Sequence, residues 1–184
     1  VISWLTGFGG SQKATAELAE MDVVFDDYPK PTKLIKYFLQ MSAEPSGIFM
    51  DFFSGSATTG HAVLDQNSID GHNRKYIMVQ LPEEVEPSSS AYKAGFKNIA
   101  EISKERLRRA GKKLLDGDCH ESWNRDVGFR VLKIDSSNMT DVYYRPDEVK
   151  QDELFGQVDS VKPDRTAEDL LFQVLIDWGV ELTL

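Results

Sequence analysis

The residues best suited to chemistry form a small, hydroxyl-rich run directly after a short apolar segment. Residues 48–53 are apolar apart from Asp51, and residues 54–60 are all Ser, Gly, Ala or Thr. This change predicts a buried strand, a tight turn and a helix from Thr58 to about residue 66. Such a turn presents backbone N–H groups and a helix N-terminus to a ligand. The alternative is a plain connection that needs Gly55 only for its backbone angles.

A second informative stretch precedes the first and holds a lysine between two prolines. Pro29 and Pro31 predict an extended entry into a helix, and Pro31 can take the first helical position. Lys30 has little freedom there, which suits a contact with an anionic or polar group. The alternative is an ordinary proline-bounded helix start. The apolar residues of the helix share one face, which should pack on a sheet: Leu34, Ile35, Phe38 and Leu39.

A second strand is predicted over residues 76–81, a mostly apolar run after a polar connection. A strand, a helix and a strand in this order imply a parallel pair with a right-handed crossover. In nucleotide-binding folds of this kind, a polar or acidic side chain after the second strand bonds the ribose hydroxyls. The candidates here are Gln80, Glu83 and Glu84.

Helical periodicity also extends over residues 14–21 and, as one long helix, over residues 91–115. The long helix has a basic face, which either meets phosphates or is simply solvated. Its basic residues are Lys104, Arg108 and Lys112, with Arg106, Arg109 and Lys113 at the flank. Residues 127–134 predict a third strand.

The net charge of −9 is concentrated in the C-terminal part of the chain, after residue 134. The preceding part is nearly neutral and can still present a basic surface to phosphates. After a polar, meandering segment to residue 164, a terminal helix is predicted over residues 166–178. Thr166 and Asp169 take capping positions, and Gly179 ends the helix. Its apolar face must be buried against this chain or a partner.

Composition restricts the class of protein further. The single Cys119 excludes an internal disulfide framework and fits a reducing cytoplasm. The three histidines have no metal-ligand spacing, so no metal site is expected. No apolar run is long enough for a membrane span and no secretory leader is evident, so no membrane partner is expected. The first residues from Val1 have the character of mid-protein sequence, so we interpret the chain as a fragment.

Two motifs taken together carry a resemblance to a known family. Pro29-Lys30-Pro31-x-x-Leu34-Ile35 and, further on, Asp51-Phe52-Phe53-Ser54-Gly55-Ser56-x-Thr58-Thr59 resemble the paired S-adenosylmethionine motifs of β-class DNA amino-methyltransferases. The later sequence is similar to the C-terminal part of the modification subunit of type III restriction–modification systems, a DNA adenine-N6 methyltransferase. The segments concerned are residues 74–83, 92–100, 104–113, 128–131 and 169–173.

The resemblance implies an α/β fold: a partial Rossmann-like S-adenosylmethionine-dependent methyltransferase fold of parallel strands with flanking helices, plus a small C-terminal α/β extension. Residues 1–22 would end the target-recognition region or connect it. Residues 23–134 would be the cofactor-binding part of the methyltransferase domain. Residues 135–184 would be an acidic extension with a terminal helix.

The resemblance also assigns cofactor-binding residues by motif. Lys30, Pro31 and Thr32 should close the methionine end of S-adenosylmethionine. The loop beneath the methionine and ribose should comprise Asp51, Phe52, Phe53, Ser54, Gly55 and Ser56, followed by Thr58 and Thr59. The ribose and adenine end should be met by Gln80, Leu81 and Glu83. Many β-class relatives have Glu where this chain has Gln80, and an amide bonds ribose hydroxyls without charge assistance.

The family's catalytic motif, (Asp/Asn)-Pro-Pro-(Tyr/Phe), occurs nowhere in the 184 residues. We expect it upstream of Val1, so this chain should not transfer a methyl group by itself. Its implied partners are DNA and the restriction subunit. A sheet without its upstream strands leaves an open edge and apolar faces, so a homodimer is also expected.

Two other classes of function stay open at this point. One is a non-catalytic module in which the basic helix and the terminal helix contact subunits or partners. The other is a dinucleotide oxidoreductase, which is disfavoured because the glycine-rich run lacks a Gly-x-Gly-x-x-Gly pattern.

Overall fold

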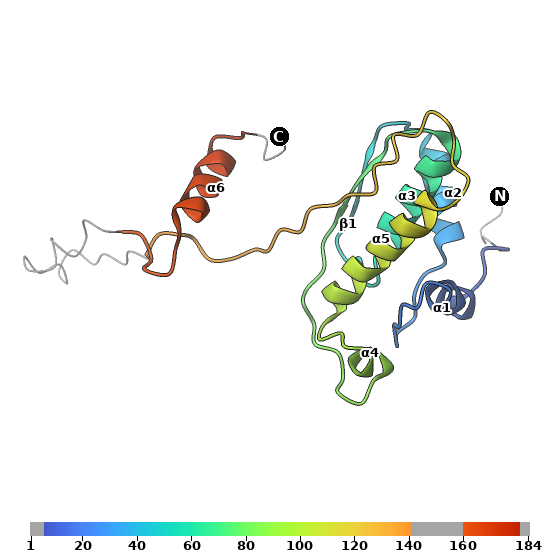
Figure 1. Ribbon diagram of the computed structural model, residues 1–184, viewed down its shortest axis with the longest axis horizontal. Coiled ribbons are helices and arrows are strands. Elements are labelled where there is room, and N and C mark those ends of the chain that lie inside the picture. Colours follow the sequence, from blue (N-terminus) through green and yellow to red (C-terminus); the bar gives the residue numbers. More distant parts are fainter. Residues whose placement is uncertain (1–5, 141–159, 181–184) are drawn as a thin grey trace, which may run out of the picture. The chain divides into compact units, whose positions relative to one another are not determined.

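A computed structural model describes residues 6–140 and 160–180 of the chain. The chain divides into two compact units, Val1–Phe129 and Arg130–Leu184. The first unit holds both of the motifs identified in the sequence (Figure 1). The two units are described separately.

The centre of the first unit is a parallel two-stranded sheet. Strand β1 (Ile48–Asp51) pairs with β2 (Lys75–Met78), and the register joins Ile48 to Lys75 and Asp51 to Met78. Helix α3 (Thr58–Asp70) crosses between them. The predicted parallel strand–helix–strand unit is confirmed. Both strands are shorter at their carboxyl ends than predicted, because β1 ends at Asp51 and β2 ends at Met78. Phe52 and Phe53 therefore lie beyond β1.

The described residues of this unit contain four further helices. Helix α1 (Ser11–Ala19) and α2 (Thr32–Ser42) precede the sheet, and α4 (Ser90–Lys93) and α5 (Ile99–Leu115) follow it. The prediction of one continuous helix over residues 91–115 was therefore wrong. The chain turns at Gly95, whose φ of +97° is left-handed, and a new helix starts where Asn98 accepts a hydrogen bond from the Glu101 N–H.

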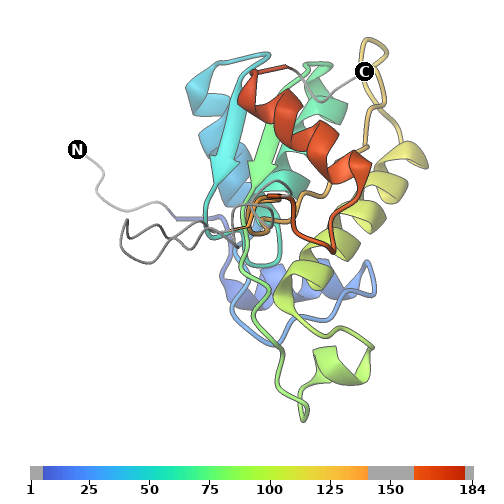
Figure 2. The same ribbon diagram turned by 90° about the vertical axis from the view of Figure 1, so that its left-hand side faces the viewer.

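Helices α2 and α3 cover one face of the sheet, and Figure 2 shows them behind the two strands. Helices α2 and α3 pack on Phe49 and Tyr76 of the strands through a common cluster, which consists of Leu39, Ala62 and Val63. Helix α5 runs beside α3 (Figure 1), with Leu107 against Leu64. Helix α1 joins α5 through a cluster that includes Leu18, Met21, Val23, Ile102 and Ala110. The N-terminal helix is thus part of the core.

The other face of the sheet is apolar and exposed. Ile48, Met50 and Ile77 alternate with the helix-facing residues along the strands and are 63%, 50% and 45% exposed. Parallel sheets are normally covered on both faces. The predicted exposed apolar face is therefore present in the described residues.

The second unit contains one helix in its described part, α6 (Ala167–Asp177). Thr166 and Asp169 form the predicted capping box, and Gly179, with a φ of +66°, follows the helix as predicted. No residue of α6 is buried, and Leu171 and Trp178 are 56% and 80% exposed. The extension otherwise shows an isolated antiparallel bridge between Met139 and Val161.

The prediction of a third strand over residues 127–134 was wrong. These residues are in no strand, and Leu132 and Ile134 are 78% and 100% exposed. Alternating apolar residues stay irregular when no neighbouring strand supplies hydrogen-bond partners. The polar segment to residue 164 lies partly outside the described residues. Within the described ranges, no helix is long and apolar enough to cross a membrane.

Candidate cofactor-binding site

Asp51 organises the turn between β1 and α3. Its Oδ1 accepts a hydrogen bond from the Phe53 N–H at 3.1 Å, and its Oδ2 accepts one from Thr59 Oγ1 at 2.7 Å. The Ser54 N–H donates to the carbonyl of Val79 at 3.1 Å, just beyond β2. One carboxylate therefore spans the loop, and the loop is tied to the carboxyl end of the neighbouring strand.

Gly55 lies at the centre of this loop, in a left-handed conformation with φ +50°. Its N–H donates to Gln80 Oε1 at 2.7 Å, and its carbonyl accepts a hydrogen bond from the Ser103 hydroxyl of α5. Gln80, predicted to bond ribose, therefore holds the loop in this structure. Leu81 and Glu83 follow it with exposed side chains. The structure brings Gln80 to the loop, and the ribose-binding role of these three residues stays a prediction.

The helix-start motif lies against the same loop. Thr58 Oγ1 donates to the carbonyl of Lys30 at 3.3 Å, while the Lys30 side chain is exposed. Pro31 is the N-cap of α2, one position before the place predicted from sequence. The hydroxyl and the N–H of Thr32 both donate to Glu17 Oε2, at 2.6 and 3.3 Å. The two predicted motifs thus meet in space.

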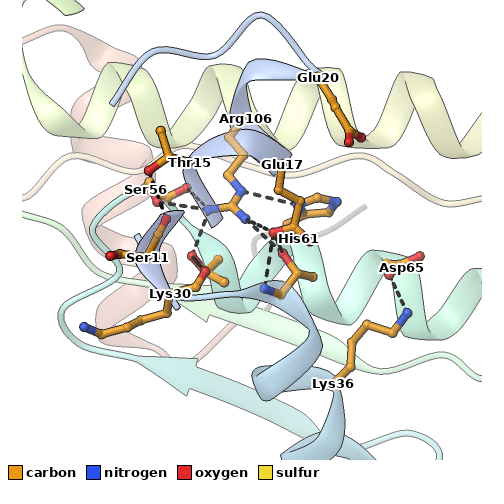
Figure 3. Close-up of polar contacts among 12 residues, drawn as sticks. Ser11, Thr15, Glu17, Glu20, Lys30, Lys36, Ser56, His61, Asp65 and Arg106 are labelled. Carbon is orange, nitrogen blue, oxygen red and sulfur yellow. Dashed lines mark hydrogen bonds and ion pairs between the residues drawn. The ribbon is translucent and has the colours of Figure 1, made fainter. Parts of the chain in front are cut away.

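Arg106 of α5 is a residue of this site that the sequence analysis missed. It is completely buried and reaches the polar groups of both motifs (Figure 3). Its guanidinium donates to Ser56 Oγ at 3.0 Å, Thr58 Oγ1 at 2.8 Å and Thr32 Oγ1 at 3.0 Å. The available signal was its spacing: Arg106 is four residues after Ile102 and four before Ala110, on the apolar face of the helix.

His61 lies next to Arg106 and accepts a hydrogen bond from Arg106 Nε to its Nδ1, at 3.3 Å. Burial lowers the pKa of His61 to about 3, with smaller contributions from the positive charges of Arg106, Lys113 and Lys36. The imidazole is therefore neutral at physiological pH. Its role here is to accept a hydrogen bond from the buried guanidinium.

We expect His61→Asn to reduce the loss in the free energy of unfolding that the unchanged chain shows as the pH falls below 6.5. The ordinary pKa of 6.5 falls to about 3 on folding, so between these values the unfolded chain binds a proton that the folded chain does not. The contribution of neutral His61 to the free energy of unfolding is fully present above pH 6.5. It is lost as the pH falls towards 3, by up to about 1.4 kcal/mol per pH unit. Urea unfolding at a series of pH values measures this.

The asparagine oxygen can take the place of Nδ1 as acceptor, so the variant should fold. Asp70 and Glu105 also have lowered pKa values, but their ordinary values of 3.8 and 4.5 lie below pH 5, so the comparison is made above pH 5. If the free energy of unfolding of His61→Asn falls as steeply from neutral pH to about pH 5 as that of the unchanged chain, His61 does not have the lowered pKa assigned to it.

The loop has features that fit a bound polar cofactor. Ser54 Oγ is buried and has no hydrogen-bond partner. The N-terminus of α3 has no side-chain cap, and the first N–H groups of a helix are suited to bind an anionic or polar group. Phe52 and Phe53 are 63% and 91% exposed at the same end of the sheet, where their rings can pack on an apolar group. No group of three or more side chains that could hold a metal ion occurs in the described ranges.

The basic face of α5 is largely engaged within the molecule. Arg109 donates to the carbonyls of residues 21 and 22 and pairs with Glu105 at 2.6 Å. Lys113 pairs with Glu20 at 3.2 Å, and Arg108 lies over the ring of Phe129. These pairings favour the interpretation of a solvated and packed helix face over that of a phosphate-binding stripe.

A parallel strand that ends in an uncapped, hydroxyl-rich turn is typical of α/β proteins that bind ligands at the carboxyl ends of their strands. Residues 8–91 match the sequence model of the DNA methylase family, N6_N4_Mtase.

The chain is also similar to three characterised proteins. It is 38% identical over 109 residues to the type III restriction-modification enzyme StyLTI Mod subunit of Salmonella typhimurium, which covers 59% of this chain and 16% of that protein. It is 35% identical over 127 residues to the EcoP15I Mod subunit of Escherichia coli, 66% of this chain and 18% of that protein. It is 36% identical over 99 residues to the type II methyltransferase M.KpnI of Klebsiella pneumoniae, 53% of this chain and 24% of that protein.

The chain thus spans between 16% and 24% of the length of these relatives. The predicted resemblance to type III modification subunits is confirmed.

Proposed function

We propose that this chain is the cofactor-binding part of a cytoplasmic, site-specific DNA adenine-N6 methyltransferase of a type III restriction–modification system. The observation that carries the proposal is the meeting of residues 30–32, residues 51–59 and Gln80 at the carboxyl ends of two parallel strands. The family match and the two Mod relatives support it. The parallel unit then forms part of a Rossmann-like methyltransferase fold.

In this proposal, S-adenosylmethionine would supply a methyl group to the adenine amino nitrogen. The methyl carbon–sulfur bond would break as the carbon–nitrogen bond forms, with S-adenosylhomocysteine and one proton as the other products. Lys30, Pro31 and Thr32 close the methionine end of the cofactor. Asp51 holds the loop and places a negative charge towards the methionine ammonium group. Gln80, Leu81 and Glu83 meet the ribose and adenine. The 184 residues contain no (Asp/Asn)-Pro-Pro-(Tyr/Phe) motif, so residues outside them hold the flipped base.

Transfer of a tritiated methyl group tests the proposed function. The complete modification subunit that carries this sequence should label duplex DNA, and digestion should yield N6-methyladenine as the labelled nucleoside. The 184-residue chain alone should give no label above background. Labelled cytosine from the complete subunit, or transfer by the chain alone, would contradict the proposal.

A second candidate function is subunit or partner contact, and the exposed apolar residues of α6 favour it. Leu171 and Phe172 of this helix and its C-cap residue Trp178 are 56%, 43% and 80% exposed. Exposed apolar patches of this kind often mark interaction sites. The partners that the type III relatives suggest are DNA, the restriction subunit and a second copy of the modification subunit.

We expect deletion of residues 166–184 from the complete subunit to weaken capture of the restriction subunit or to shift a dimer towards monomer. Pull-down and light scattering on the same samples measure the two effects. Replacement of Glu168 by Gln, on the same helix, provides a matched control without loss of apolar surface. An unchanged mass together with unchanged capture would rule out this role for α6.

A further inference from the structure

Arg106 joins three segments that are far apart in the sequence. From its place on α5 it donates to Thr32 at the start of α2, to Ser56 in the loop and to Thr58 at the start of α3 (Figure 3). These three acceptors are hydroxyls of buried residues. Arg106 also donates to His61 Nδ1 and to the Ser56 carbonyl, each at 3.3 Å. The guanidinium therefore sits at the junction of the two cofactor motifs.

Stability alone does not account for a charge at this position. Arg106 has 0% exposure, and it pairs at 3.7 Å with Glu17, whose side chain is 35% exposed. Burial lowers the pKa of Arg106 only to about 10, so the group stays charged at neutral pH. An apolar side chain of similar size commonly stabilises a core as well as a buried, incompletely paired charge does.

The geometry of the guanidinium explains why arginine occupies the site. Nη1 donates to Ser56 Oγ and Thr58 Oγ1, and Nη2 donates to Thr32 Oγ1. A planar fork holds these acceptors at fixed separations, whereas a lysine ammonium is a single point on a flexible stem. The fork therefore sets the distance between the start of α2 and the start of α3.

The hydroxyls held by Arg106 also make the direct contact between the motifs. Thr58 accepts from Arg106 while donating to the Lys30 carbonyl, and Thr32 accepts from Arg106 while donating to Glu17. Because hydroxyl hydrogens rotate, the arginine fixes the donor direction of both threonines. Loss of the guanidinium would free both hydroxyls to rotate and the two helix starts to separate.

We propose that Arg106 is a positioning residue that fixes residues 30–32 against residues 54–58, so that both close on the cofactor without Arg106 touching it. This inference rests on the proposed function. It adds a fourth segment, α5, to the cofactor site. It also predicts that loss of the Arg106 hydrogen bonds weakens cofactor binding even in a variant that still folds.

The test compares Arg106→Met with Arg109→Met in the complete subunit. Both variants remove a guanidinium from α5, but Arg109 holds the carbonyls of residues 21 and 22 and touches neither cofactor motif. Calorimetry well below each melting temperature should show the Kd for S-adenosylmethionine rising at least about tenfold in Arg106→Met and staying within about twofold in Arg109→Met. Arg106→Lys should lie between Arg106→Met and the unchanged protein.

Steady-state methylation supplies a second readout that a merely structural role would not move. Arg106→Lys should raise KM for the cofactor and leave kcat within about twofold, because the reacting groups are untouched. If Arg106→Lys and Arg106→Met keep the original Kd, or if Arg109→Met weakens binding equally, the inference is overturned while the proposed function stands. If the unchanged complete subunit does not bind the cofactor, the proposed function itself fails.

Discussion

Replacing Asp51 by alanine should weaken binding of S-adenosylmethionine to the complete subunit by at least about 100-fold. The carboxylate accepts hydrogen bonds from the Phe53 N–H and the Thr59 hydroxyl, so it spans the loop from one end to the other. In the proposed site, it also places a negative charge towards the methionine ammonium. Alanine removes both contributions at once. Isothermal titration with the cofactor measures the change in Kd.

Two control variants separate the contributions of Asp51. Asp51→Asn keeps an oxygen acceptor for Phe53 but loses the charge, so its Kd should lie between those of the alanine variant and the unchanged protein. Asp65→Ala removes a different acid, which pairs with Lys36 of α2 at 2.6 Å. Its Kd should be unchanged. If Asp51→Ala binds S-adenosylmethionine as tightly as the unchanged subunit, the loop is not part of the cofactor site.

Gly60→Val should lower the free energy of unfolding by about 3 kcal/mol. A Cβ at Gly60 would lie 2.8 Å from Leu107 Cδ2 and 3.3 Å from Met78 Sδ, so α3 can approach α5 and the sheet closely only with glycine here. A branched side chain must push these elements apart, and it does so within the first turn of α3, next to the loop. Urea denaturation monitored by circular dichroism measures the loss.

Gly117→Val is the matched control for this prediction. A Cβ at Gly117 would meet only two carbonyl oxygens at 3.5 and 3.7 Å, which is ordinary contact. Its unfolding midpoint should shift much less. Equal midpoints for the two variants would show that the close approach of α3 to α5 does not limit stability.

The strand–helix–strand unit could be predicted because its signals are local. The apolar run at β1, the small residues after it and the apolar run at β2 each indicate one element, and the right-handed crossover rule then implies the parallel pairing. The capping box of α6 was equally local, since Thr166 and Asp169 contact each other across three residues.

Elements that depend on distant partners were less predictable. Residues 127–134 have strand-like composition, but no strand lies beside them in the described part of the chain, so the pattern alone was misleading. The break after α4 depends on one left-handed residue, Gly95, inside an otherwise helical pattern. A single glycine in such a pattern is tolerated in many helices, and only the local backbone decides.

The candidate site shows the same division between local and long-range information. Asp51 and the loop could be identified from their own sequence. Arg106 was missed, because the basic residues around it suggested a solvated face and its acceptors are 45 to 74 residues away. Gln80 was recognised as polar and well placed, but its contact with the Gly55 N–H depends on how the loop folds back.

Hydrogen–deuterium exchange on the complete subunit, with and without S-adenosylmethionine, tests the central claim most directly. The proposed site predicts that the cofactor slows amide exchange in peptides covering residues 30–39, 51–60 and 78–84, where the two motifs and the end of β2 meet. Peptides of the exposed helix α6 should exchange at the same rate in both states. Bound cofactor without slower exchange in the first two peptides, or with protection confined to other segments, would contradict the account.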